Sequence, residues 1–440
     1  MRKSRRDFMK RAALGTAALV IPAKETLASL MATAENPRAS GADKAAGGVA
    51  PSNVLGANDR VRVGMIGVGG RGQDLLREIL GVPNTQLVAI ADVYSRRRDE
   101  AKKMAPGIET MSDHRRLLER NDIDAVIVAS PLHIHARHFL DALAAGKDLY
   151  SEKTMTWSIP EAEECLSAAK KSDRVVQIGL QHESGGALAD TRAWMEQGIV
   201  GKVTQVEAWM SRNTPHGKGQ WVRAVPPDCR AENVDWSAFL NGRPDTGFDG
   251  YRFMNWRLFW EFSGGNVTEN MVHQISWIIS ALKLDLPTAA YMSGGIFSEK
   301  DGREVPDTIV VTLDYAGDVV VTWQSTFSNS HYGLGERLLG SDGTVEHTEG
   351  VTDMVHGESA EQLRYYPEKV NRPSGEPLTG QSRDRNHMAN WIDCVRSRKQ
   401  PNAPVEAGYR SAIACHMANL AYRNKERVTL GQARAMKPEY

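Results

Sequence analysis

The sequence predicts an α/β protein built from two domains. Residues 60–182 are expected to form a doubly wound parallel sheet, because short apolar strands alternate there with amphipathic helices. Residues 183–430 are expected to form an α+β domain with an open, mainly antiparallel sheet, because strands follow one another there with turn signals between them. The 440 residues also exceed what one hydrophobic core usually serves.

The first 34 residues have the composition of an export signal. SRRDFMK (4–10) has the paired arginines of a twin-arginine (Tat) signal, and AALGTAALVIP (12–22) is apolar but shorter than the roughly 20 residues of a spanning helix. Residues 32–34 (ATA) offer a cleavage site. We therefore expect a Tat signal peptide over 1–34, the Tat translocase as a partner, and a periplasmic or otherwise exported protein. A basic amphipathic helix or an uncleaved signal anchor is the alternative.

Residues 35–59 are rich in Ala, Gly, Ser and Asn without periodicity, and we expect a flexible leader there. The chain balances 54 basic against 54 acidic residues. Residues 1–34 hold seven of the basic and two of the acidic ones, which leaves 47 basic and 52 acidic residues and a net charge of −5. Such a mildly acidic protein has no bulk attraction for nucleic acid, and we expect no nucleic-acid partner.

The first strand, VRVGMIG, runs into a glycine-rich turn of the form GxGxxG, and QDLLREIL continues as a helix. In such a turn the first glycine permits a tight bend, the second lets the backbone approach a pyrophosphate, and the third lets helix and strand pack closely. Free N–H groups at the start of the helix then bind phosphate. The pattern predicts a Rossmann dinucleotide site with contacts from Gly67, Gly69, Gly70, Arg71 and Gly72.

A second strand, QLVAIAD, ends at Asp92, 20 residues after Gly72. An acidic residue at this distance can hydrogen-bond both ribose hydroxyls, which favours NAD over NADP. Ser95 and the three arginines at 96–98 could accommodate the 2′-phosphate of NADP, but we prefer to interpret them as a solvated start of a helix.

Two further loops, SPLHIH (130–135) and SEKTMTW (151–157), follow predicted strands at the edge where ligands of such sheets bind. With the glycine turn, they resemble the Gfo/Idh/MocA family of sugar-linked oxidoreductases over about residues 61–430. Leu132 replaces the Asn of the family's Pro-Asn-x-x-His, and Thr154 replaces the Pro of its Glu-Lys-Pro. The resemblance implies that the cofactor is contacted by Ser130, Pro131, His133, His135, Glu152 and Lys153.

A third family signature, a glycine-rich segment leading to Asp-x-x-x-His, is present as GGNVTENMVH, in which Glu269 replaces Asp and His273 is retained. Four-residue spacing places both side chains on one face of a helix, where the carboxylate could orient the imidazole and stabilise its protonated form. The resemblance implies three catalytic residues: Lys153 to bind the reacting oxygen, His273 to take or return its proton, and Glu269 to support His273. An ordinary i,i+4 surface pair is the alternative for Glu269 and His273.

The substrate is expected to lie at the junction of the two domains. QIGLQHES ends the last strand of the first domain, and the resemblance implies that Gln181 and His182 lie near the sugar; a polar hinge is the alternative. Six of the ten tryptophans fall between residues 209 and 277, and indole rings stack well on sugars. We expect Trp256 to wall the pocket and Arg212, with Asn213 and His216, to reach it, whereas core packing explains at least half of the tryptophans.

Apolar strands such as DTIVVTLDY (307–315) and DVVVTWQSTF (318–327) build the second domain. The resemblance implies that the exposed face of their sheet makes a homo-dimer or homo-tetramer contact. The predicted helices over 385–400 and 405–426 are expected to pack on this sheet or on the first domain.

A metal centre is not expected from the sequence. Catalytic zinc usually has three protein ligands, and the histidines of the chain offer no tight ligand spacing on one element beyond the HxH of His133 and His135. Cys165, Cys229, Cys394 and Cys415 lack CxxC spacing and do not resemble a disulfide framework or a zinc site.

Export of a folded protein constrains the function. A dinucleotide is not freely available outside the cytoplasm, so we expect a tightly bound NAD, with NADP as the alternative, that is restored within each catalytic cycle. Two behaviours of the family fit: an NAD(P)-dependent oxidoreductase of a sugar or sugar derivative, and an NAD-dependent glycosidase that works by transient oxidation, elimination, hydration and re-reduction. We prefer the oxidoreductase, the commoner activity. A non-catalytic binding protein is disfavoured because Lys153 and His273 are both present.

Overall fold

The computed structural model describes residues 60–215, 218–349 and 361–436. The expected signal peptide (1–34), the expected leader (35–59) and His216 lie outside the described residues. Within the described ranges, the helices are too short or too polar to cross a membrane.

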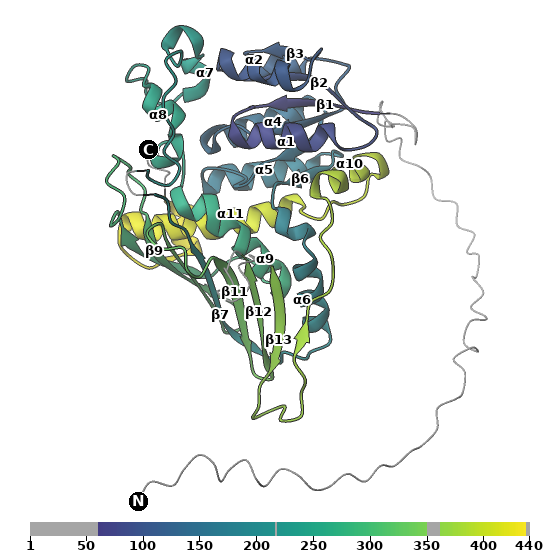
Figure 1. Ribbon diagram of the computed structural model, residues 1–440, viewed down its shortest axis with the longest axis vertical. Coiled ribbons are helices and arrows are strands. Elements are labelled where there is room, and N and C mark those ends of the chain that lie inside the picture. The colour runs from purple at the N-terminus through teal and green to yellow at the C-terminus, as the bar shows by residue number, and fades with distance from the viewer. Residues whose placement is uncertain (1–59, 216–217, 350–360, 437–440) are drawn as a thin grey trace, which may run out of the picture. The chain divides into compact units, whose positions relative to one another are not determined.

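The first sheet is parallel throughout, and its six strands lie in the order β3-β2-β1-β4-β5-β6 (Figure 1). The strand order reverses between β1 and β4, which opens a crevice at the carboxyl ends of the strands. The strands are β1 (Val61–Ile66), β2 (Thr85–Ala91), β3 (Glu109–Met111), β4 (Ala125–Val128), β5 (Asp148–Ser151) and β6 (Val176–Ile178). The predicted doubly wound sheet is confirmed.

Helices connect these strands, as the alternating pattern predicted. They are α1 (Gly70–Leu80), α2 (Ser95–Met104), α3 (His114–Leu118), the 3₁₀ turn η1 (Leu132–Ile134), α4 (His135–Ala144) and α5 (Ile159–Lys171). Helix α5 shows how local sequence sets a boundary: Ser158 and Glu161 form a capping box, and Pro160 occupies the first turn, where its missing N–H costs nothing.

The second sheet has nine strands in the order β14-β13-β12-β11-β7-β10-β9-β8-β15. All neighbouring pairs in this sheet are antiparallel except β7 and β10, so the predicted mainly antiparallel sheet is confirmed. The strands are β7 (Val203–Ser211), β8 (Ala289–Gly295), β9 (Thr308–Tyr315), β10 (Val319–Thr326), β11 (Leu334–Gly340), β12 (Gly343–Glu349), β13 (Gln362–Pro367), β14 (Leu378–Thr379) and β15 (Val428–Thr429).

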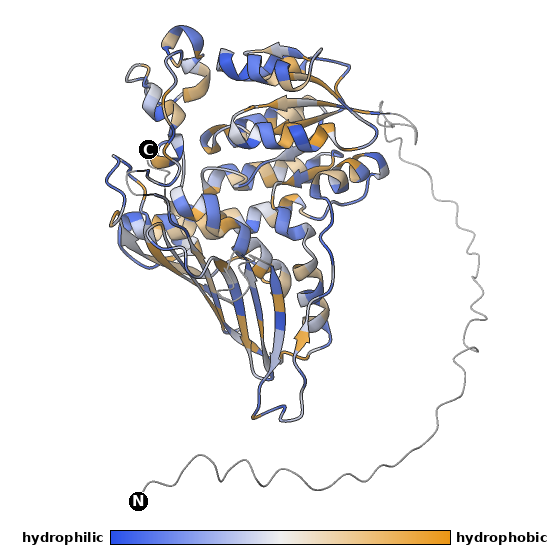
Figure 2. Cartoon of the chain, in the orientation of Figure 1, coloured by the Kyte–Doolittle hydropathy of each residue, from blue (hydrophilic) through white to orange (hydrophobic). Residues whose placement is uncertain are grey.

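Three helices cover one face of this sheet: α6 (Gly186–Glu196), α9 (Val272–Leu282) and α11 (Val405–Asn424) (Figure 1). Every second side chain of β9 is buried beneath them, starting at Ile309, as expected for a half-covered antiparallel sheet. Figure 2 shows the alternation of hydrophobic and hydrophilic residues along these strands. Between the layers, the indole N–H of Trp323 donates to Gln274 Oε1 at 2.6 Å.

Two segments from the second half of the chain return to the first sheet. Helix α10 (His387–Ser397) packs on α1 and β1 and places Trp391 and Ile392 in the same core as Val63, while α11 contacts both β8 and α5. The predicted packing of the last helices is thus divided between the two domains. Helix α12 (Leu430–Ala435) follows β15.

The second returning segment is a compact aromatic cluster over residues 229–262. Its elements are η3 (Ala231–Asn233), α7 (Trp236–Leu240), α8 (Gly250–Met254) and η4 (Trp256–Leu258). Phe239, Phe253 and Phe262 pack there against Tyr94, which follows β2, and a bridge joins Tyr94 to Val234. The cluster covers the approach to the carboxyl ends of β1 and β2.

The four cysteines are buried and unpaired.

Candidate functional site

A cavity of about 1160 Å³ lies at the carboxyl ends of the first sheet. It is walled by loops of that sheet, by the aromatic cluster and by the start of α9. Sixteen of the residues predicted from the sequence line it: Gly67, Gly69, Gly70, Arg71, Asp92, Ser130, Pro131, His135, Glu152, Lys153, Gln181, His182, Arg212, Trp256, Glu269 and His273. Gly72 and His133 do not.

The glycine turn has the geometry that a pyrophosphate needs. Gly67 has a φ of 86°, and a Cβ there would lie 2.8 Å from the backbone of Ala129. A Cβ on Gly72 would lie 2.3 Å from the Gly67 carbonyl oxygen. Gly72 therefore packs against the backbone of the turn and does not contact a ligand. Gly69 lines the cavity with only Arg97 near it. The turn therefore leaves backbone free for close approach of a phosphate group.

Asp92 lies at the end of β2 with its carboxylate already engaged by the protein. Asp92 Oδ2 accepts the N–H of Val68 at 2.8 Å, and Oδ1 accepts the N–H of Tyr94 at 2.9 Å. These bonds lock the glycine turn to the end of β2. Each oxygen keeps a further lone pair, so the carboxylate can still accept a hydrogen bond from a ribose hydroxyl.

Of the three arginines after Asp92, two are bound to other protein groups and one lines the cavity. Arg96 pairs with Glu100 and Asp228, and Arg98 donates to the backbone oxygen of Asp92. Arg97 alone of the three lines the cavity, beside Gly69.

Arg223 also reaches the glycine turn, and a side chain at Gly70 would meet its guanidinium at 2.9 Å. The sequence did not point to Arg223, because it lies in no motif and its backbone is held by hydrogen bonds to the Asn255 side chain in the returning segment. With Arg71 and Arg97, it supplies positive charge where a dinucleotide carries its phosphates.

Lys153 and Glu269 meet between the two domains. Lys153 Nζ donates to the backbone oxygen of Glu269 at 2.6 Å and lies 3.6 Å from Glu269 Oε2. The same carboxylate accepts from Arg257 Nε at 2.9 Å. Burial raises the pKa of Glu269, but the charges of Arg257 and Lys153 outweigh it and hold the pKa below its usual value. Arg257 was missed because nothing local marks its pairing with Glu269.

Thr154, which stands in place of the family's proline, ties the same loop to the second domain. Its hydroxyl donates to the backbone oxygen of Thr268 at 2.6 Å. The Lys153–Thr154 peptide bond is cis.

The expected pairing of Glu269 with His273 is wrong. Glu269 lies in a π-helical turn, η5 (Val267–Met271), and α9 begins one residue before His273. A π-turn has more residues per turn than an α-helix, so side chains four apart are not stacked on one face. The carboxylate turns to Arg257 and Lys153, and His273 Nδ1 is buried without a hydrogen-bond partner among the described residues.

The charge state of His273 also differs from the expectation. Desolvation lowers the pKa of His273 well below its usual value, and the nearby charges of Lys153, His182, Arg71 and Arg212 lower it further. The imidazole is therefore neutral near pH 7 and can accept a proton. This is the state that a general base requires.

The two histidines of the SPLHIH loop both direct ring nitrogens to backbone oxygens. His133 turns away from the cavity: its Nε2 lies 2.6 Å from the Phe239 backbone oxygen, and its ring packs on Phe239 and Phe262. The predicted contact of His133 with the cofactor is therefore wrong. His135 lines the cavity, but its two ring nitrogens lie 2.7 Å from the backbone oxygens of Ser130 and Thr154, and so the ring bridges the two loops.

Glu152 organises the floor of the cavity. It accepts from Arg71 Nε at 2.8 Å, from Gln181 Nε2 at 3.3 Å and from the backbone N–H of Lys153 at 3.1 Å. A Cβ on Gly179 would lie 2.8 Å from the Glu152 carboxyl carbon, so a larger residue there would displace the carboxylate. The carboxylate thus links the glycine turn, the Lys153 loop and Gln181.

The predicted substrate residues gather at the far end of the cavity. His182 and His273 have ring centroids 5.6 Å apart, and Arg212 and Trp256 line the same wall. The Arg257 guanidinium lies 4.2 Å from the centre of the Trp256 ring. Trp221 also lines the cavity, whereas Trp277 is buried in the core, which agrees with the expected division of the tryptophans.

The sequence and the fold are similar to those of known proteins. The sequence is 32% identical over 181 residues to an inositol 2-dehydrogenase of Gluconacetobacter diazotrophicus, a match that covers 40% of this chain and 53% of the relative. It is 28% identical over 233 residues to an alpha-N-acetylgalactosaminidase of Shewanella oneidensis, which covers 49% of each. The chain thus spans about half the length of the curated relatives it matches.

The fold matches that of an aldose-aldose oxidoreductase from Caulobacter crescentus, with a TM-score of 0.62, 16% identity, and coverage of 84% of this chain and 99% of the other. Residues 61–180 match the family described as "Oxidoreductase family, NAD-binding Rossmann fold", and residues 244–430 match its "C-terminal alpha/beta domain". Both matches are to one family and together cover more than half of the sequence. The chain belongs to the Gfo/Idh/MocA family of NAD-binding oxidoreductases.

Proposed function

We propose that this chain is an NAD-dependent oxidoreductase that acts on a sugar or sugar derivative. One observation carries the proposal: Lys153 and the neutral imidazole of His273 line the same cavity as the glycine turn. The inositol dehydrogenase relative supports a polyhydroxylated substrate.

The residues divide the work of oxidising a hydroxyl. NAD bound along the glycine turn would supply the hydride acceptor, and Asp92 favours it over NADP. Lys153 donates a hydrogen bond to the reacting oxygen and stabilises negative charge on it, while His273 accepts the hydroxyl proton. Glu269, held by Arg257, acts as a positioning residue for Lys153. Gln181, His182, Arg212 and Trp256 hold the sugar.

Because the pKa of His273 lies well below its usual value of about 6.5, the base stays unprotonated in mildly acidic solution. We expect kcat/KM for oxidation to stay level from about pH 8 down to about pH 6.5, and to fall about tenfold per pH unit only below the lowered pKa. A pH–rate profile of the wild-type enzyme measures this. A decline already centred at or above pH 6.5 would contradict the assigned state of His273.

The second prediction concerns Lys153. Lys153→Met removes the only charge assigned to the reacting oxygen and should lower kcat by about 100-fold or more, without loss of bound nucleotide. The measurement is kcat together with the nucleotide content of the purified variant. The control is Lys202→Met, since Lys202 is exposed and pairs with Asp318 on the second sheet. Full activity of Lys153→Met would overturn the mechanism.

A glycosidase is the second candidate, and the alpha-N-acetylgalactosaminidase relative favours it. With NAD as the hydride acceptor, the same acid–base pair would support a transient oxidation of a glycoside hydroxyl, which would acidify a neighbouring C–H and permit elimination and hydration; return of the hydride from the cofactor would then re-reduce the keto group. The two candidates differ in their products. A glycosidase releases free sugar from a glycoside without any net change in NADH absorbance. An oxidoreductase instead yields an oxidised sugar, and passes the hydride either to a second carbohydrate on the same bound cofactor or to added NAD.

We also propose that the protein is exported through the Tat pathway with NAD tightly bound. The basic and apolar pattern of residues 1–34 supports export. The exported protein, purified without added nucleotide and denatured, should release about one dinucleotide per chain. Empty protein that binds NAD only weakly would contradict the proposal and indicate a conventional dehydrogenase.

Self-assembly is proposed through the uncovered face of the second sheet. Tyr291 on β8 and Val310 on β9 are 47% and 49% exposed there and are diagonal neighbours across the strand pair, in which Tyr291 lies opposite Thr312 and Val310 opposite Ser293. Light scattering should give a mass of two or four chains, and Val310→Lys should shift it toward one. The neighbouring Val311 is buried on the covered face, so a substitution there would not test the contact between chains. A monomeric wild type would refute the proposal.

A further inference from the structure

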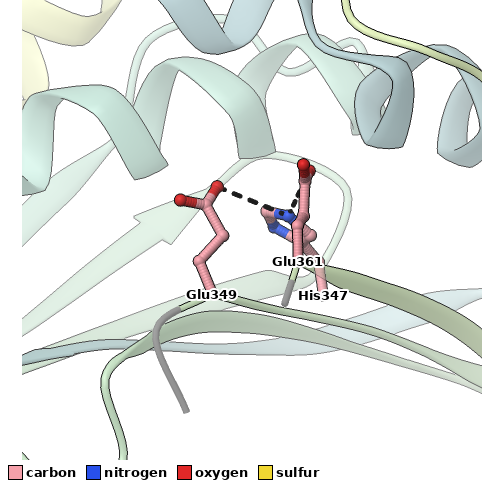
Figure 3. Close-up of side chains that lie close together, drawn as sticks. All are labelled: His347, Glu349 and Glu361. Atoms are coloured by element: carbon pink, nitrogen blue, oxygen red, sulfur yellow. Dashed lines mark hydrogen bonds and ion pairs between the residues drawn. The ribbon is translucent and has the colours of Figure 1, made fainter. Parts of the chain in front are cut away.

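Three neighbouring strands of the second sheet carry a cluster of ionisable side chains that the proposed reaction does not use. Glu336 on β11 lies directly opposite His347 on β12, and Glu349 ends β12. Glu361 immediately precedes β13, in the register that places it opposite Glu349. Figure 3 shows the His347 ring between the carboxylates of Glu349 and Glu361, all on the side of the sheet that the helices cover.

The distances within the cluster are those of a small chelating site. His347 Nε2 lies 2.9 Å from Glu361 Oε1 and 3.6 Å from Glu349 Oε1, and the three ligand atoms lie within 4.8 Å of one another. Two ligands at about 2.1 Å from one zinc ion are about 3.4 Å apart at a tetrahedral angle. Small rotations of the half-buried Glu349 and the exposed Glu361 side chains are enough to reach that geometry.

The other nitrogen of His347 has the partner typical of a metal-bound histidine. Nδ1 lies 2.6 Å from Glu336 Oε2, and Glu336 has no exposed surface. A buried carboxylate that accepts the Nδ1 proton fixes the tautomer and directs the Nε2 lone pair outward. The ring is further held by stacking on Trp277, with centroids 5.6 Å apart. This arrangement is independent of the two other glutamates and points to a ligand at Nε2.

The cluster also has an excess of negative charge. Like charges directly across an antiparallel pair are destabilising, and Glu349 faces Glu361 in that way. Among the described residues, no lysine or arginine forms an ion pair with either of them or with Glu336. Within the cluster, three carboxylates therefore face a single histidine side chain.

We propose that His347 Nε2, Glu349 and Glu361 bind a divalent transition-metal ion of the zinc or manganese class. One imidazole and two carboxylates suit such ions, and a divalent charge compensates the opposed glutamates better than a proton does. His182 Nε2 lies 3.9 Å from Glu349 Oε1, and His182 lines the substrate cavity. The ion therefore sits behind the wall that we assign to the sugar. The proposal stands apart from the proposed reaction and does not depend on it.

The test is metal binding by the full chain, freed of metal with a chelator and titrated with Zn²⁺ in a calorimeter. The wild type should bind one Zn²⁺ per chain, with a matching rise in Tm. Glu361→Gln, an exposed and conservative change, should weaken the binding at least about tenfold. Glu346→Gln is the control, since Glu346 lies on β12 next to His347 but pairs with Arg337 on the other face. It should bind like the wild type.

Two results would overturn the proposal. The first is a wild type that shows neither binding nor a rise in Tm with Zn²⁺ or with Mn²⁺. In that case an imidazolium at His347 alone compensates the negative charge of the glutamates. If Glu361→Gln binds as tightly as the wild type, the metal is bound elsewhere. Glu349→Gln provides the second variant, and an unchanged affinity there would have the same meaning. None of these readouts depends on turnover, so failure here leaves the oxidoreductase proposal untouched.

Discussion

The contact on which the candidate site depends is the bond from Lys153 Nζ to the backbone oxygen of Glu269. It joins the loop after β5 to the π-helical turn before α9, and so it connects the cofactor side of the cavity to the substrate side. Thr154 reinforces it through the Thr268 backbone oxygen. Arg257 completes it by holding the Glu269 carboxylate near the lysine. A shift of either loop would separate the lysine from the imidazole with which it is proposed to work.

The histidines show how the same side chain takes opposite charge states in one chain. His273 is surrounded by cationic groups and loses its charge, because desolvation and like charge both disfavour imidazolium. His347 is surrounded by carboxylates, and their hydrogen bonds overcome an equally unfavourable burial. The first state suits a base, and the second marks a place where positive charge is required. His182 lies between the two and contacts both surroundings.

The returning segments explain why the cavity is closed on several sides. Residues 229–262 pack on Tyr94 through phenylalanine rings and bring Trp256 and Arg257 to the wall. Helix α10 fills the outer side of the first sheet with Trp391. Because both segments belong to the second half of the chain, the first sheet shares its core with residues more than 200 positions away, as the bond from Gln177 to the His387 backbone oxygen illustrates.

Local sequence determined the parts of this protein whose physics is local. The glycine turn, the alternation of strands and helices, and the loops that end in Asp92 and Lys153 follow from backbone conformation and hydrophobic period, and the structure has them where they were predicted. Tertiary structure decided the rest. A π-turn redirected Glu269 from His273 to Lys153, the aromatic cluster drew His133 out of the cavity, and strand register assembled Glu336, His347, Glu349 and Glu361. Such contacts depend on which distant segments meet, and no spacing along the chain encodes that.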